Sequence, residues 1–131
     1  MIPALEDKQM TRKQDGVWIA APGLVSWSEW HINFVERAAA FTQKKRARIC
    51  AHGDDSNMHQ MLIAHRIGTE NPEHSHEKAE SVLMLRGTMC MHIQGKPSYF
   101  LHAGEFLRIP GGVRHQPCPV TDCVFLECCE K

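Results

Sequence analysis

Four residues of the types that bind transition metals occur in two short segments of the sequence. His74 and His76 are two residues apart, so their side chains project from the same face if that segment is extended. Glu80 follows four residues after His76, and His115 comes from a distant segment. Three imidazoles and one carboxylate that converge would suit a divalent transition metal. The sequence therefore offers a candidate metal site, provided that the fold brings the two segments together.

The segments that must position these residues are mostly short and apolar, and Gly or Pro separates them. Such segments are typical of the strands of an all-β sandwich or barrel. They are residues 46–52, 61–67, 81–86, 88–94, 98–103, 105–110 and 123–129. Gly87 and the run from Gly95 to Pro97 predict tight antiparallel connections. Because small antiparallel sheets protect their edges by closing, we expect a barrel or jelly roll.

One helix is expected, within residues 26–45. Ser26 followed by Glu29 is typical of a capping box at the helix start. An apolar stripe at helical spacing, which we expect to pack on the sheet, consists of Trp27, Trp30, Phe34, Val35, Ala38 and Phe41. His31 lies beside this stripe, and we expect it at the surface or at the boundary.

The segments before the helix are less regular. Residues 1–15 are expected to fray. Residues 16–25, with a turn at Pro22 and Gly23, are expected to add an edge strand or reach a second subunit.

The first strand after the helix carries two arginines on one face. Its period of two places Arg46, Arg48, Cys50 and His52 on one side and Ala47, Ile49 and Ala51 on the other. A strand face with two arginines usually meets solvent. The functional alternative is an anion-binding edge, because the forked guanidinium matches a carboxylate or phosphate.

Composition excludes some classes of partner. The 131 residues include 15 basic and 15 acidic ones, so no net charge attracts nucleic acid or an anionic membrane. No apolar run approaches the roughly 20 residues of a membrane span, and the first fifteen residues lack the apolar centre of a secretory signal, so we expect a cytoplasmic protein. The six cysteines are then expected to be reduced and mostly buried, with Cys118 and Cys123 or vicinal Cys128 and Cys129 as the alternative for a redox or metal role.

The glycines, prolines and candidate ligands together resemble the two motifs of the cupin family. The first motif falls on Gly68, His74, His76, Glu80 and Gly87, and the second on Gly104, Pro110, Gly112 and His115. Pro119 stands where the family has an asparagine, which is not a metal ligand in the motif, so its loss leaves the metal prediction intact. The resemblance implies a double-stranded β-helix, or jelly roll, with one N-terminal α-helix. It also implies one divalent ion (Fe, Mn, Ni, Co or Zn) held by His74, His76, Glu80 and His115.

Residues 36 to 115 are also similar to the WbuC-type cupin metalloproteins, whose genes are associated with O-antigen and other surface-polysaccharide biosynthesis. A metal at such a site can act as a Lewis acid or activate water or dioxygen, which favours a metalloenzyme of the dioxygenase, isomerase or lyase type that acts on a small oxygenated metabolite. The resemblance to the WbuC-type proteins implies that this metabolite is carbohydrate-related. The alternative is a non-catalytic cupin that binds or senses a small molecule through its metal.

Cupin barrels commonly pair through sheet faces, which implies a homodimer. We expect a single domain of residues 46–131, preceded by residues 1–45 as an extension and helix that pack on the barrel. Further polar groups that could surround the ligands are Tyr99, His92, His102, Arg86 and Arg108.

Overall fold

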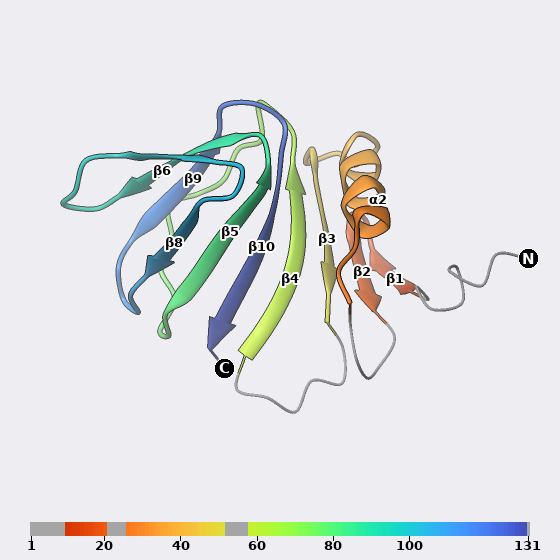
Figure 1. Ribbon diagram of the computed structural model, residues 1–131, viewed down its shortest axis with the longest axis horizontal. Coiled ribbons are helices and arrows are strands. Elements are labelled where there is room, and N and C mark those ends of the chain that lie inside the picture. Colours follow the sequence, from red (N-terminus) through yellow and green to blue (C-terminus); the bar gives the residue numbers. More distant parts are fainter. Residues whose placement is uncertain (1–9, 21–25, 52–57, 131) are drawn as a thin grey trace, which may run out of the picture.

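Two β-sheets face each other, and one helix covers the outside of the larger sheet (Figure 1). This computed structural model describes residues 10–20, 26–51 and 58–130. The larger sheet has the order β1 (Met10–Gln14), β2 (Val17–Ala20), β3 (Arg46–Cys50), β4 (Met58–His65), β10 (Cys123–Glu130), β5 (Glu80–Arg86) and β8 (Phe106–Ile109). The smaller sheet has the order β7 (Tyr99–His102), β6 (Thr88–Ile93) and β9 (His115–Pro119), and the helix is α2 (Glu29–Ala39). The predicted all-β jelly roll with one N-terminal helix is confirmed.

The main core fills the space between the two sheets. It is built from the inward side chains of alternating positions, namely Ile63, Val82, Met84, Met89, Met91, Leu101, Ile109, Cys123 and Phe125. Within the described ranges, β1, β2 and β3 contribute no residue to this cluster. The inner face of β3 therefore does not pack in the main core.

The helix covers the outer face of the larger sheet, to the right in Figure 1. Val35 and Ala39 are almost fully buried there against Ala47 and Ile49 of β3 and Leu62 of β4. The predicted alternation of β3 is confirmed for residues 46–50, whereas His52 lies outside the described residues.

The predicted cap of the helix was wrong. Ser28 caps it in place of Ser26, and the His31 imidazole accepts the Ser28 backbone N–H at 3.1 Å. His31 is buried, so the prediction of a surface or boundary position was also wrong. The helix also ends at Ala39, which leaves Phe41 beyond it and 86% exposed.

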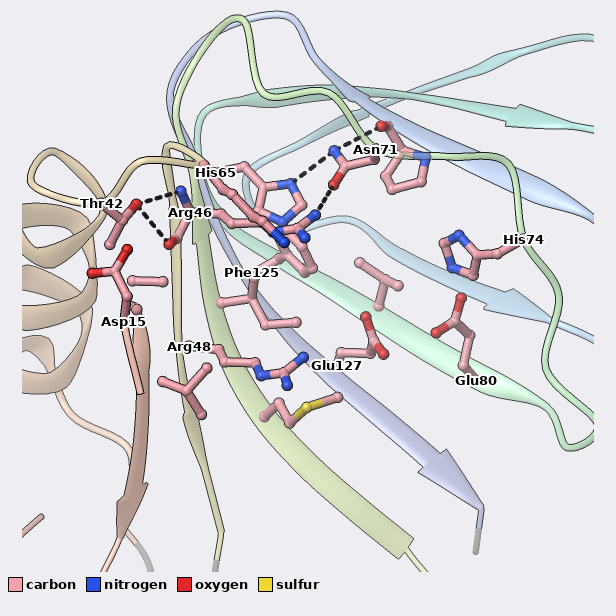
Figure 2. Close-up of a pocket in the computed structure, with 18 of the residues that line it drawn as sticks. Asp15, Thr42, Arg46, Arg48, His65, Asn71, His74, Glu80, Phe125 and Glu127 are labelled. Carbon is pink, nitrogen blue, oxygen red and sulfur yellow. Dashed lines mark hydrogen bonds between the residues drawn. The ribbon is translucent and has the colours of Figure 1, made fainter. Parts of the chain in front are cut away.

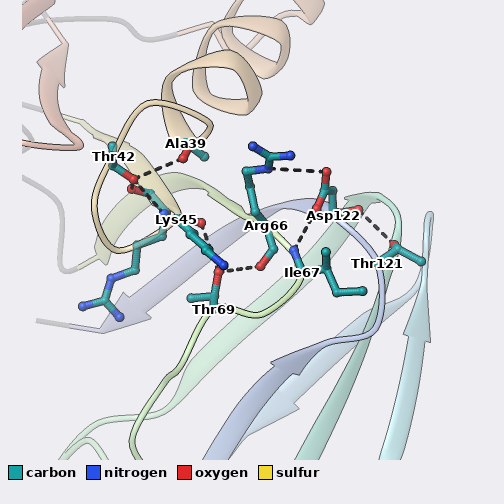
Figure 3. Close-up of polar contacts among 9 residues, drawn as sticks. Ala39, Thr42, Lys45, Arg66, Ile67, Thr69, Thr121 and Asp122 are labelled. Atoms are coloured by element: carbon teal, nitrogen blue, oxygen red, sulfur yellow. Dashed lines mark hydrogen bonds and ion pairs between the residues drawn. The ribbon is translucent and has the colours of Figure 1, made fainter.

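A network of polar contacts joins the helix end to the start of β3 (Figure 3). The Thr42 hydroxyl accepts the Arg46 backbone N–H at 3.0 Å and lies 3.2 Å from the Ala39 carbonyl oxygen. The Lys45 carbonyl accepts the Thr69 hydroxyl at 3.0 Å and the Arg66 backbone N–H at 2.9 Å. These bonds fix where β3 begins.

Two further expectations about strands need correction, and a third is confirmed. Residues 10–14 form β1, which pairs antiparallel with β2, so this part of the N-terminus is an ordered edge strand. Gly87 does not close a hairpin, because β5 and β6 belong to different sheets and the chain crosses between them there. Gly87 has a φ of +78°, and a Cβ atom would collide with the Asp122 carbonyl oxygen, so only glycine fits. The hairpin predicted at Gly95 to Pro97 is confirmed between β6 and β7.

Strand β9 was missed because it contains Pro117 and Pro119. Proline lacks the N–H that a ladder needs and is therefore confined to edges. β9 is such an edge, since β6 is its one partner among the described strands and its other side meets only a short bridge at His74. Pro119, in place of the motif asparagine, lies opposite Met89 at the end of that pairing.

All six cysteines are free, and Cys90 and Cys123 are buried. The predicted turn at Pro22 and Gly23 lies outside the described residues. In the part of the chain that the structure describes, no helix is long and apolar enough to cross a membrane.

Candidate metal centre

Backbone hydrogen bonds bring the two ligand segments together. The His74 and His115 N–H groups each donate to the other residue's carbonyl, at 2.9 and 2.8 Å. The Gly112 N–H donates to the His76 carbonyl at 2.7 Å. Gly111 passes so close to the Glu77 carbonyl that a Cβ atom would collide with it. The bend at Pro110 to Gly112 therefore returns the chain to the HxH segment, as the sequence predicted.

Two of the histidine rings are oriented by carbonyl groups. The His115 Nδ1–H donates to the Val113 carbonyl at 2.9 Å, and the His74 Nδ1–H donates to the Pro72 carbonyl at 3.0 Å. In a neutral imidazole this leaves the Nε2 lone pair available as a ligand. The ring centroids of His74 and His115 are 4.4 Å apart, and those of His74 and His76 are 5.0 Å apart.

Glu80 completes the cluster from the start of β5. One carboxylate oxygen contacts His115 Nε2 and the other lies 3.5 Å from His76 Nε2. One ligand atom from each of His74, His76, Glu80 and His115 lies within 4.8 Å of the others. All four predicted residues thus come together.

The donor set fits a divalent transition metal. Glu80 and His115 are only 3% and 2% exposed, and the buried His115 Nε2 contacts a Glu80 carboxylate oxygen. A neutral ring would direct a lone pair at a carboxylate, so the contact needs a proton or a metal ion between the two groups. Three imidazole nitrogens and one carboxylate accept iron, manganese, cobalt, nickel or zinc.

The charges of the cluster are coupled. Burial opposes the charged form of His115, but the Glu80 carboxylate and the Val113 carbonyl raise its pKa above the ordinary 6.5. Burial likewise opposes the charged form of Glu80, but its hydrogen bonds to His115 and Glu127 lower its pKa below 4.5. Without a metal, the pair is therefore held as an ion pair.

Comparisons with known proteins agree with this geometry. The family model described as "Cupin domain" matches residues 62–127, half of the chain. The chain belongs to the cupin family. A search among curated proteins found no match.

Many solved structures share the fold of this cupin. A conserved Streptococcus pyogenes protein of unknown function is 19% identical with a TM-score of 0.61, over 68% of this chain and 76% of that chain. The DMSP lyase DddQ from Ruegeria pomeroyi is 20% identical with a TM-score of 0.59, over 66% of this chain and 47% of that chain. KdgF from Halomonas sp. is 14% identical with a TM-score of 0.58, over 65% and 77%. At these identities the likeness shows the fold alone.

The cupin's site also contains Glu127, which the sequence did not single out, and Cys129, which it considered only within a vicinal pair for a redox or metal role. The Cys129 thiol lies 3.5 Å from Glu80 and 3.3 Å from Glu127, and the two carboxyl groups are themselves hydrogen-bonded. Burial and the nearby charge of Glu80 raise the pKa of Glu127 to about 7. The sequence could have revealed Glu127 as a lone glutamate within an apolar strand. It stands two residues from Phe125, which faces the core, so both side chains lie on the same face of the strand.

The four candidate ligands, His74, His76, Glu80 and His115, form what we call the metal cluster. It lines one side of a pocket of about 590 Å³ (Figure 2). The Arg46, Arg48 and His65 side chains line the opposite side, from β3 and β4. The five polar groups that the sequence left unassigned do not line this pocket. Three of them bond elsewhere: Arg86 contacts Glu29 and Glu36 of the helix, His92 contacts Ser98, and His102 contacts Thr88.

Proposed function

We propose that this cupin is a metal-dependent enzyme that transforms a small oxygenated metabolite, carbohydrate-related in the first instance. One observation carries the proposal. The buried His115 Nε2 meets a Glu80 carboxylate oxygen within a cluster of four side chains that could hold a metal ion, at the wall of a pocket.

His74, His76, Glu80 and His115 would hold the ion. Bound there, it would supply Lewis acidity or, if redox-active, oxygen chemistry, which correspond to isomerase-type and dioxygenase-type reactions. The carbonyl groups of Pro72 and Val113 keep two imidazoles in the tautomer that presents Nε2. Glu80 and His115 are shielded from water, whereas the His76 side chain is 41% exposed, so a small molecule could approach the ligands from the His76 side.

Two sets of observations support the class of substrate. The pocket volume of about 590 Å³ is in the range of small-molecule sites. The similarity of residues 36 to 115 to WbuC-type cupin metalloproteins supports a carbohydrate-related compound. The cupin neighbours include an enzyme described as a DMSP lyase, so the fold is compatible with catalysis.

The test combines metal analysis with turnover. Protein purified without added metal should contain about one transition-metal ion per chain, and the metal-loaded protein should convert at least one compound from a panel of sugars, nucleotide sugars and sugar acids. Oxygen uptake by the iron-loaded protein would separate dioxygenase from isomerase chemistry.

The Glu80→Gln variant separates catalysis from simple binding. If metal remains bound, a catalytic site should lose turnover, whereas a non-catalytic binding or sensing site should retain its ligand. Metal-loaded protein that binds these compounds but converts none would support the binding alternative. A protein that takes up no transition metal would contradict both.

A further inference from the structure

Two arginine side chains face the same pocket as the metal cluster. Arg48 lies opposite Ile63 of β4, which lies opposite Phe125 of β10, and both apolar side chains belong to the core between the sheets. Arg46 is paired in the same way with His65. Because directly opposed residues project to the same face of a sheet, both arginines lie on the face that carries the pocket, where Arg46 is half-buried and Arg48 is exposed. Figure 2 shows the Arg48 guanidinium directed into the pocket, on the side of Glu127.

Arg46 is held in place by neighbouring polar groups. Its Nη1 donates to Asn71 Oδ1 at 3.0 Å, and the Asn71 amide donates to the Pro117 carbonyl at 3.2 Å. Burial, followed by the charge of Arg46, lowers the pKa of His65 to about 4. The positive charge that disfavours a proton on His65 would favour an anion at the same place.

In the described part of the chain, the two pocket arginines differ from several other arginines in lacking a carboxylate partner. Arg66, Arg86 and Arg114 each form an ion pair with a carboxylate. Across residues 10–20, 26–51 and 58–130, no carboxylate lies within salt-bridge distance of Arg46 or Arg48. Arg48 does lie beside the Cys50 thiol, but a thiol is a weak acceptor for a guanidinium.

The acidic groups of the pocket are engaged elsewhere. Glu80 belongs to the metal cluster, and Glu127 is bonded to Glu80 and Cys129. Asp15, at the outer edge, accepts the Gln43 backbone N–H and contacts Arg12. The arginine side of the pocket therefore keeps a positive charge that no carboxylate of the described residues balances.

We propose that Arg46 and Arg48 bind a carboxylate of the metabolite whose other end meets the metal cluster, so the substrates are small carboxylic acids such as sugar acids and hydroxy acids. This inference rests on the proposed function, because it assigns the second end of the same ligand. A guanidinium presents two parallel N–H groups that match the two oxygens of a carboxylate. The apolar side chains of Ile63 and Phe125 line the pocket between the arginines and the metal ligands. They suit the carbon chain that joins the two polar ends of the metabolite.

The experiment is calorimetric titration of the metal-loaded protein with a series of hydroxy acids and sugar acids, their neutral amides, and inorganic phosphate. The wild-type protein should bind at least one acid more tightly than its amide and more tightly than phosphate. Arg48→Gln should weaken that binding about ten- to hundredfold, the usual effect of losing a hydrogen bond to a charged group. The affinity of Arg48→Lys for the acid should lie between those of the wild type and Arg48→Gln, since lysine keeps the positive charge but lacks the two parallel N–H groups of arginine.

Arg108→Gln is the matched control, because Arg108 is exposed on β8 and does not line the pocket. It should bind the acids as the wild type does. Metal content is measured for every variant, and all should retain the wild-type amount.

Two results would overturn the inference while the proposed function stands. One is metal-loaded protein whose affinity for the acids is unchanged in Arg48→Gln and in the Arg46→Gln/Arg48→Gln double variant. The other is phosphate binding at least as tightly as the best acid. A wild-type protein that takes up no metal would instead overturn the proposed function.

Discussion

Removal and return of the metal should change thermal stability by a predictable amount. The four ligand atoms come from two distant segments and lie within 4.8 Å of one another only when the chain is folded. An ion that binds them therefore stabilises the folded state by RT ln(1 + [M]/Kd), about 2.7 kcal/mol at a free concentration one hundred times Kd. For a chain of 131 residues, about 1 kcal/mol corresponds to roughly 3–5 °C in Tm, so the expected rise is about 8–13 °C.

The assay is differential scanning fluorimetry of chelated protein with manganese, iron, cobalt, nickel or zinc added singly. The wild type should show the rise with at least one ion. His115→Ala should lose most of it, because His115 supplies a fully buried ligand atom. His92→Ala is the control, since His92 is exposed and bonds to Ser98 away from the pocket. A Tm that no ion changes, or a full rise in His115→Ala, would refute the assignment of the site.

Four further outcomes are expected. Metal affinity, measured by competition with a chelator, should increase from pH 6 to pH 8, because the proton on His115 stabilises the metal-free protein below pH 6.5 and is lost as pH rises through its raised pKa; a flat profile would contradict this. Glu127→Ala should weaken metal affinity about tenfold or more while Glu127→Gln changes it little, since Glu127 is hydrogen-bonded to ligand Glu80; equal effects would argue against this positioning role. Gly111→Ala should lower the stability of chelated protein by about 1–3 kcal/mol in denaturant unfolding, because the added Cβ meets the Glu77 carbonyl, and no loss would mean that the bend adjusts freely. We also propose a homodimer, for which light scattering should give twice the chain mass of 14.9 kDa, and a mass of one chain would exclude it.

The sequence was sufficient for much of the site because its signals are local. The two-residue spacing of His74 and His76 predicts that both side chains project from one face of an extended segment. The proline and glycines before His115 predict a bend in the chain. The apolar segments that form β4, β5, β6, β7, β8 and β10 were recognisable for the same reason, since alternation depends only on neighbours along the chain.

Contacts between distant segments could not be read in this way. The helix cap moved to Ser28 because the His31 imidazole, buried under tertiary packing, accepts its backbone N–H. Strand β9 forms despite Pro117 because its place at an edge leaves that residue without a required donor. Local patterns did not reveal either arrangement.

The sequence by itself was enough to select the four candidate metal ligands, since residue type and spacing specify a donor set. It left open whether Arg46 and Arg48 meet solvent or an anion, and it did not single out Glu127. Sheet pairing decided these points. The register of β3, β4 and β10 places the arginines and Glu127 on the inner face, in one pocket with the metal cluster. Which face of a strand is inward depends on what packs against it, and only the tertiary structure supplies that.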